Sequence, residues 1–198
     1  MLLSFVVLSK NQPTKLLNLA EQQQQKLVEK FGLLENQKWL KRCDQLMTTL
    51  SLSEFNQCFI IDADFANAYS LANGVLILTK GLMQNIKNDD QLAHIMSHEH
   101  AHLVLNHHHQ AMQMVNNPPT FFTKSRLKKF YRQLESAADQ AATERMLELK
   151  RDPLQIHHYL LRIEKNSKED SSDHQKIKDR IQRNDLPDEV LETFWLSQ

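Results

Sequence analysis

The amino-acid sequence predicts an α+β domain that is mostly α-helical and carries one small β-sheet. Only three glycines and five prolines occur in 198 residues, which is typical of a helical chain with few tight turns. Apolar residues three and four positions apart recur over long stretches, as on one face of a helix. The strand signals are confined to about residues 58–78, where short apolar runs flank an Asn-Gly pair.

Length and composition indicate one domain with terminal extensions. Hydrophobic residues make up 41% of the chain, enough for a real core, and 24 basic residues balance 24 acidic ones. The neutral total gives no basic field for nucleic acid or an anionic membrane surface. No apolar run approaches the roughly 18 residues of a transmembrane span. We divide the chain into an N-terminal helical segment (1–57), a core (58–184) and a C-terminal tail (185–198).

The first two predicted helices lie in the N-terminal segment. One covers residues 14–31, after Pro13 and before a Gly32 stop. Asn36 caps the next, whose apolar stripe includes Cys43. Two cysteines are too few for a disulfide scaffold, so a buried free thiol is the favoured interpretation of Cys43. A single bridge to Cys58 is the alternative and would imply an oxidising compartment.

The predicted sheet has about three strands. Residues 58–61 form a short apolar strand, and residues 69–71 and 75–78 form a hairpin around Ala72-Asn73-Gly74. A short helix is expected over residues 80–86, after Thr79.

The remaining elements are predicted to be helices. Asn88 and Gln91 form a capping box that opens one long helix, which continues to Asn116-Asn117-Pro118-Pro119. Its buried side is predicted to comprise Leu92, Ile95, Met96, Leu103 and Val104. Further helices are expected over residues 123–150, from Asp152-Pro153 to about 165, and over 174–183.

His98-Glu99-His100-Ala101-His102 is the motif that carries chemistry. On a helix, residues i and i+4 lie about 40° apart around the axis, so His98 and His102 can bind one metal ion. Glu99 lies about 100° around the helix axis from His98, beside the ion, where it can take a proton from a bound water. His100 points off this face. His94 is a less suitable ligand, and His107, His108 and His109 are expected to be a solvated helix end rather than an accessory metal site.

A catalytic zinc site takes three protein ligands, and the third is expected from the helix after the Pro-Pro loop. Glu135 and Asp139 lie one turn apart there, among small residues that allow two helices to approach closely: Ala137, Ala138, Ala141 and Ala142. We assign Glu135 as the third ligand. Asp139 can accept a hydrogen bond from the outer nitrogen of a ligating histidine. A solvated acidic face is the alternative, and the alanines argue against it.

The chain resembles the HtpX / CAAX-prenyl-protease family of zinc metallopeptidases, over roughly residues 58–183. Residues 98–107 are similar to the family's His-Glu-x-x-His segment with the Asn-His that often follows. Residues 135–139 resemble its Glu-x-x-Ala-Asp segment, and residues 67–74 its Asn-Ala-Phe-Ala-Leu-Pro-Gly-Gly hairpin, with Gly81-Leu82 closing it. Ala72, Asn73 and Gln175 depart from the family pattern.

The resemblance implies a zincin-like fold. It also implies that the protein is a gluzincin, with one Zn²⁺ per chain on His98, His102 and Glu135. It implies Glu99 as general base, Asn106 as well as Asp139 in the second shell, and His174 and Arg180 near the metal, where they steady the reacting carbonyl. An extended peptide would pair with the hairpin edge by strand addition, at Asn67, Ala68, Tyr69, Ser70 and Gly74. The family's membrane helices are absent, which predicts a stand-alone soluble catalytic domain.

The sequence therefore predicts a zinc metalloendopeptidase that acts on extended peptides or unfolded proteins, with envelope protein quality control as one setting. A latent or chaperone-like member, plugged by the segment at His174 or by the tail, is the alternative. A helical binding module with incidental histidines is a second rival and predicts no tight zinc binding.

The resemblance favours the periplasm or cell envelope as the compartment. Met1–Leu8 looks like part of a signal h-region but lacks a basic n-region. This segment is either a clipped export signal or a strand or helix packed on the domain. If it is not an export signal, we expect the protein to be located in the cytoplasm.

Overall fold

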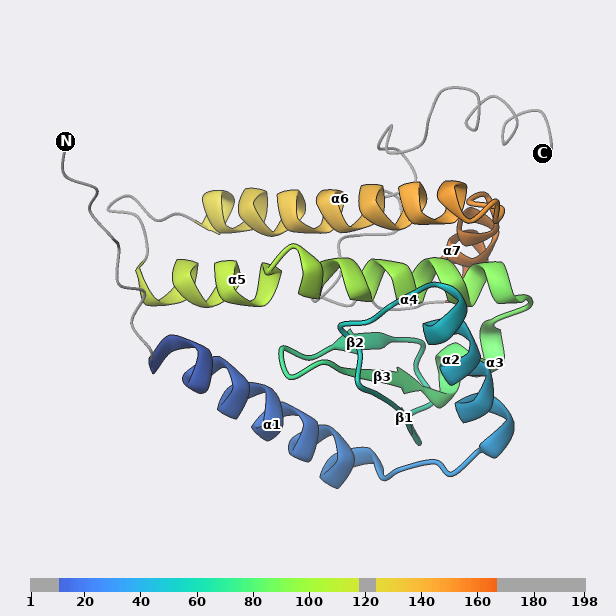
Figure 1. The fold of residues 1–198 in the computed structure, drawn as a ribbon, viewed down its shortest axis with the longest axis horizontal. Coiled ribbons are helices and arrows are strands. Elements are labelled where there is room, and N and C mark those ends of the chain that lie inside the picture. Colours follow the sequence, from blue (N-terminus) through green and yellow to red (C-terminus); the bar gives the residue numbers. More distant parts are fainter. Residues whose placement is uncertain (1–10, 118–123, 167–198) are drawn as a thin grey trace.

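A computed structural model describes residues 11–117 and 124–166 (Figure 1). His174, Arg180, the helix expected over 174–183, the tail at 185–198, the Met1–Leu8 segment and Pro118-Pro119 lie outside the described residues.

Within the described residues the chain forms seven helices and one three-stranded sheet, so the predicted mostly helical α+β fold is confirmed. The elements are α1 (Asn11–Phe31), α2 (Gln37–Thr49), β1 (Gln57–Ile61), β2 (Ala68–Ser70), β3 (Val75–Thr79), α3 (Lys80–Asn85), α4 (Asp89–Val104), α5 (His107–Asn116), α6 (Lys124–Glu148) and α7 (Gln155–Asn166). None of the described helices combines the length and the apolar character that crossing a membrane requires.

The predicted end of the first helix and the predicted cap of the second are confirmed, but α1 begins at Asn11 and includes Pro13, which was expected to precede it. Gly32 follows α1 with a φ of +76°, and its N–H donates to the Val28 carbonyl at 2.8 Å. The Asn36 side chain caps α2 by accepting from the Trp39 N–H at 3.1 Å. The apolar stripe of α2 then buries Cys43 and Leu46 in the main core.

The sheet has the order β1-β3-β2, with β1 parallel to β3 and β2 antiparallel to it. The predicted hairpin is confirmed, and a three-residue loop joins its two strands. The Gly74 N–H donates to the Leu71 carbonyl, the Leu71 N–H donates to the Val75 carbonyl, and Gly74 has a φ of +80°. A Cβ on Gly74 would also lie 2.6 Å from the Glu54 carbonyl oxygen, so this position requires glycine for two reasons. β2 is left as an outer strand, beside α4 (Figure 1).

The long helix predicted from Asn88 to Asn117 is wrong in one respect, because it is broken between α4 and α5. The Asn88 side chain caps α4 as predicted and accepts from the Gln91 N–H at 2.9 Å. The other half of the predicted capping box differs, because the Gln91 side chain accepts from the Lys87 N–H at 3.0 Å and not from that of Asn88. At the other end, Asn106 adopts a left-handed conformation with a φ of +55°, which asparagine tolerates better than most residues. The break leaves Val104, predicted to be buried, 49% exposed.

Cys43 and Cys58 form a disulfide, so the favoured interpretation of Cys43 as a free thiol is wrong. Strand β1 packs against α2, which brings Cys58 to the apolar stripe that carries Cys43. The spacing along α2 predicted burial of Cys43, but only the packing of strand on helix shows its partner. The bridge fastens the N-terminal segment to the sheet.

We expect reduction of this bridge to lower thermal stability without moving the metal site. A closed loop of about 15 residues stabilises a fold by about 3 kcal/mol, which corresponds to roughly 6–12 °C in Tm for a chain of this size. Differential scanning fluorimetry with and without reductant tests this. The Cys43→Ala/Cys58→Ala double variant is the control, and its Tm should not respond to reductant. An equal Tm for the wild type under both conditions would contradict a stabilising bridge.

Helix α6 runs alongside α4 and α5 and packs most closely on α4 (Figure 1). The small residues predicted to allow this approach include Ala138 and Ala142, which are fully buried. On its other side α4 covers the sheet, and its residues 91–94 and 96–101 are buried. The helix with the His-Glu-x-x-His motif is therefore enclosed between α6 and the hairpin strand β2.

Candidate metal centre

The structure brings His98, His102 and Glu135 together between α4 and α6. One potential ligand atom from each residue lies within 4.8 Å of the others. The two Nε2 atoms are 3.2 Å apart, and the Glu135 carboxylate oxygens lie 3.5 Å from His98 Nε2 and 3.6 Å from His102 Nε2. His98 and Glu135 are buried, and His102 is half-buried.

These separations fit a tetrahedral zinc ion. Ligand atoms bound to zinc at 2.0–2.1 Å with tetrahedral angles lie about 3.3 Å from one another. Two imidazole nitrogens and one carboxylate oxygen are also a common donor set of catalytic zinc sites, which leave a fourth position for water. The donor chemistry and the spacing therefore both suit the metal that the motif predicts.

Each histidine of the cluster also contacts a second group through its outer nitrogen. His98 Nδ1 lies 2.8 Å from Asp139 Oδ1, the contact expected for Asp139. His102 Nδ1 lies 3.1 Å from the Nδ1 of His107. Both contacts leave the Nε2 atoms directed at the common point beside Glu135.

His107 was missed by the sequence reasoning, and its expected solvation is wrong, because it is 4% exposed. The neighbouring Asn106, which the family resemblance placed in the second shell, is exposed, and its side chain makes no capping bond at α5. Its left-handed backbone instead ends α4 and turns His107 back onto His102. The sequence signals were an asparagine, a residue that tolerates this conformation, one position before a histidine, and the similarity of this pair to the Asn-His of the family segment.

The pKa of His102 is lowered to about 2, chiefly because burial disfavours the charged imidazolium and also because His98 is close. Burial likewise lowers the pKa of His107. The His102 ring is therefore neutral at physiological pH, which is the state in which a histidine binds a metal.

Glu99 lies outside the ligand cluster, on the side that faces β2. Its Oε2 accepts hydrogen bonds from the Ser70 N–H at 3.0 Å and from Ser70 Oγ at 2.9 Å. Glu99 is 4% exposed and Ser70 is 7% exposed. The motif's carboxylate is thus held beside the cluster by the hairpin.

The predicted substrate residues gather at the hairpin. Ala68, Tyr69 and Ser70 form the outer strand β2, Asn67 precedes it, and Gly74 lies in the turn. Thr79, the last residue of β3, contacts Asn67, because its hydroxyl donates to the Asn67 carbonyl at 3.0 Å.

The other histidines of α4 lie away from the cluster. His94 Nε2 lies 3.3 Å from the hydroxyl of Thr143 on α6. His100 points off the cluster, as predicted, and pairs with Glu54 in the loop before β1. His108 belongs to α5 and lies closer, with its ring centroid 6.4 Å from that of His102. It is half-buried, and burial lowers the pKa of its imidazole.

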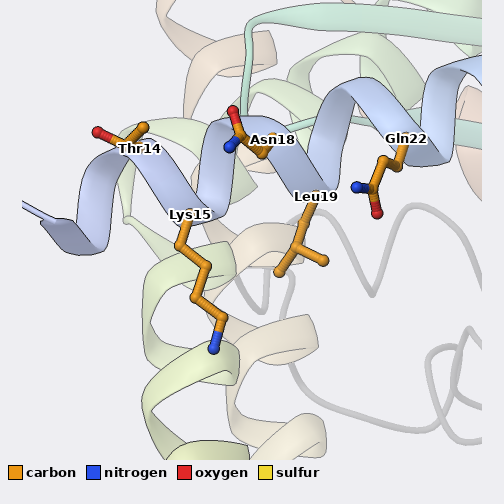
Figure 2. Close-up of a pocket in the computed structure, with 5 residues that line it drawn as sticks. All are labelled: Thr14, Lys15, Asn18, Leu19 and Gln22. Atoms are coloured by element: carbon orange, nitrogen blue, oxygen red, sulfur yellow. The ribbon is translucent and has the colours of Figure 1, made fainter.

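A separate hollow of about 420 Å³ lies on α1, away from these residues (Figure 2). It is lined by Thr14, Lys15, Asn18, Leu19 and Gln22.

Comparison with known families agrees with this geometry. The sequence model of peptidase family M48 matches residues 34–127, a stretch that includes the hairpin and the His-Glu-x-x-His helix. The chain carries a peptidase family M48 domain. No curated protein matches the chain.

The family match covers two of the three residues of the cluster, His98 and His102. The M48 match ends at residue 127, before Glu135, so α6 contributes its carboxylate through the structure and not through the matched stretch. The predicted zincin-type metallopeptidase fold is confirmed. M48 membership implies a metallopeptidase, a hydrolase of peptide bonds in protein substrates.

Proposed function

We propose that this M48 protein is a zinc metalloendopeptidase with one Zn²⁺ per chain on His98, His102 and Glu135. The observation that carries the proposal is the cluster itself. Three donor atoms from two helices lie at spacings suited to tetrahedral zinc, and a buried carboxylate stands beside them. A helical binding module with incidental histidines would have no reason to bury these groups together.

Each residue has a distinct part in the proposed reaction. A zinc ion held by these three residues would supply Lewis acidity and would lower the pKa of its bound water to about 7. Glu99 accepts a proton from the attacking water and passes it to the leaving amine. Asp139 and His107 fix the ring orientation of the two histidine ligands. We retain His174 and Arg180 as proposed stabilisers of the oxyanion.

The open edge of β2 is the proposed site for an extended peptide. In the hairpin, Asn67 and Leu71 share backbone hydrogen bonds with β3, so Ala68 and Ser70 direct their backbone groups away from β3, to the open edge. The outward N–H of Ala68 donates to the Asn67 side chain, and that of Ser70 donates to Glu99. The outward carbonyls are the groups that we expect to pair with a substrate backbone. This mode reads main chain and favours unfolded segments.

Metal content measured beside casein cleavage tests the proposed function on the full chain. We expect about one zinc per chain, cleavage that a chelator abolishes, and recovery when zinc is restored. One zinc with no cleavage would favour the latent, self-plugged form, and deletion of residues after 184 should then raise activity. Absence of zinc after reconstitution would overturn the proposal.

Asp139→Asn should weaken zinc binding by about 10–100-fold, the usual cost of removing an outer-shell partner of a histidine ligand. The amide keeps the size of the side chain but not the charge that holds His98. Competition with a zinc-binding dye measures the affinity. Glu148→Gln, at an exposed position of the same helix, is the matched control. Equal affinities for Asp139→Asn and the control would contradict the role of Asp139.

The disulfide supports an oxidising compartment, because such bonds persist mainly in exported or envelope proteins. We therefore favour the cell envelope among the two compartments that the sequence left open.

A further inference from the structure

Ser70 contacts the Glu99 carboxylate with two donors at once. Its N–H and its hydroxyl both meet Oε2, at 3.0 and 2.9 Å. Among the described residues, the hydrogen bonds that Glu99 accepts all fall on this one oxygen. The second oxygen, Oε1, can therefore accept a hydrogen bond or a proton from another group.

The two donors approach from different directions because of the position of Ser70 in the hairpin. Its N–H lies in the plane of the sheet and points out of the open edge of β2. Its side chain stands out of that plane and is buried beside α4, which packs on β2. Either donor alone would anchor Oε2, but only the pair restricts rotation of the carboxylate plane.

That restriction matters because the last torsion of a glutamate side chain is broad and has no sharp rotamer preference. A carboxylate whose Oε2 is held from one direction only can still turn about that contact and carry Oε1 away from the metal cluster. We propose that Ser70 is a positioning residue, whose hydroxyl keeps Oε1 of Glu99 turned toward the attacking water. This inference rests on the proposed peptidase function.

Ser70→Ala removes the hydroxyl and keeps the backbone N–H, so it tests the second donor alone. We expect kcat for a fluorogenic peptide to fall about tenfold, with KM within twofold and zinc content unchanged, since hydrogen bonds to charged groups are strong and depend on geometry. Ser70→Thr retains a hydroxyl on the strand and should recover most of kcat. A rise in KM alone would assign the hydroxyl to substrate contact and overturn the proposal, as would an unchanged kcat.

A double-mutant cycle on the purified protein gives a readout that needs no activity. Ser70→Ala should lower Tm by several degrees in the wild-type background and by less than half as much beside Glu99→Ala, because the partner is already gone. Additive shifts would mean that the hydroxyl acts independently of Glu99 and would overturn the proposal. Coupling in a wild type that cuts no peptide, even after deletion of residues beyond 184, would overturn both the proposed function and the positioning role in catalysis, and would leave a contact that serves stability alone.

Discussion

Glu99→Gln should retain zinc and lose nearly all peptide cleavage. We expect kcat/KM to fall by about a hundredfold to ten-thousandfold, the usual contribution of a general base. The amide has the shape of the carboxylate, and its oxygen can still accept from Ser70, so the helix and the hairpin keep their contact. It cannot take a proton from the attacking water. Zinc content and peptide cleavage, measured on the same preparation, separate these effects.

Glu144→Gln is the matched control for the loss of a carboxylate. Glu144 is exposed on α6, where it accepts from Gln140, so this variant should cleave like the wild type. Cleavage by Glu99→Gln at the control rate would refute Glu99 as the base. Loss of zinc together with activity would instead show that Glu99 supports the metal site, a role that the described contacts do not assign to it.

The fold was largely predictable because its signals are local. Capping by Asn36 and Asn88, the turn at Gly74 and the spacing of His98 and His102 each depend on a few consecutive residues. The alanines of α6 also correctly indicated a helix that packs closely on another.

The missed features depend on packing between distant segments or on a single backbone angle. The disulfide requires α2 to lie on β1, and the Ser70–Glu99 contact requires the hairpin to lie on α4. The break at Asn106 depends on one left-handed residue, in a stretch whose composition suits a continuous helix. That one angle decides whether His107 is solvated or lies against His102.

Glu135→Gln should weaken zinc binding by more than about a hundredfold. Loss of an outer-shell partner alone costs 10–100-fold, and Glu135 offers a donor atom inside the cluster itself. A neutral amide oxygen is a poorer zinc ligand than a carboxylate, and the two histidines that remain leave the site one protein ligand short. Competition with a zinc-binding dye measures the affinity, and Glu144→Gln on the same helix is again the control.

The same experiment decides between Glu135 and any ligand outside the described residues. If Glu135→Gln and Glu135→Ala bind zinc as tightly as the wild type, the third ligand is elsewhere, and His174 becomes the first residue to replace. If both lose zinc while their metal-free Tm stays close to that of the metal-free wild type, the loss is one of coordination and not of folding. Because the family match ends at residue 127, before Glu135, this result would establish independently that α6 completes the metal centre.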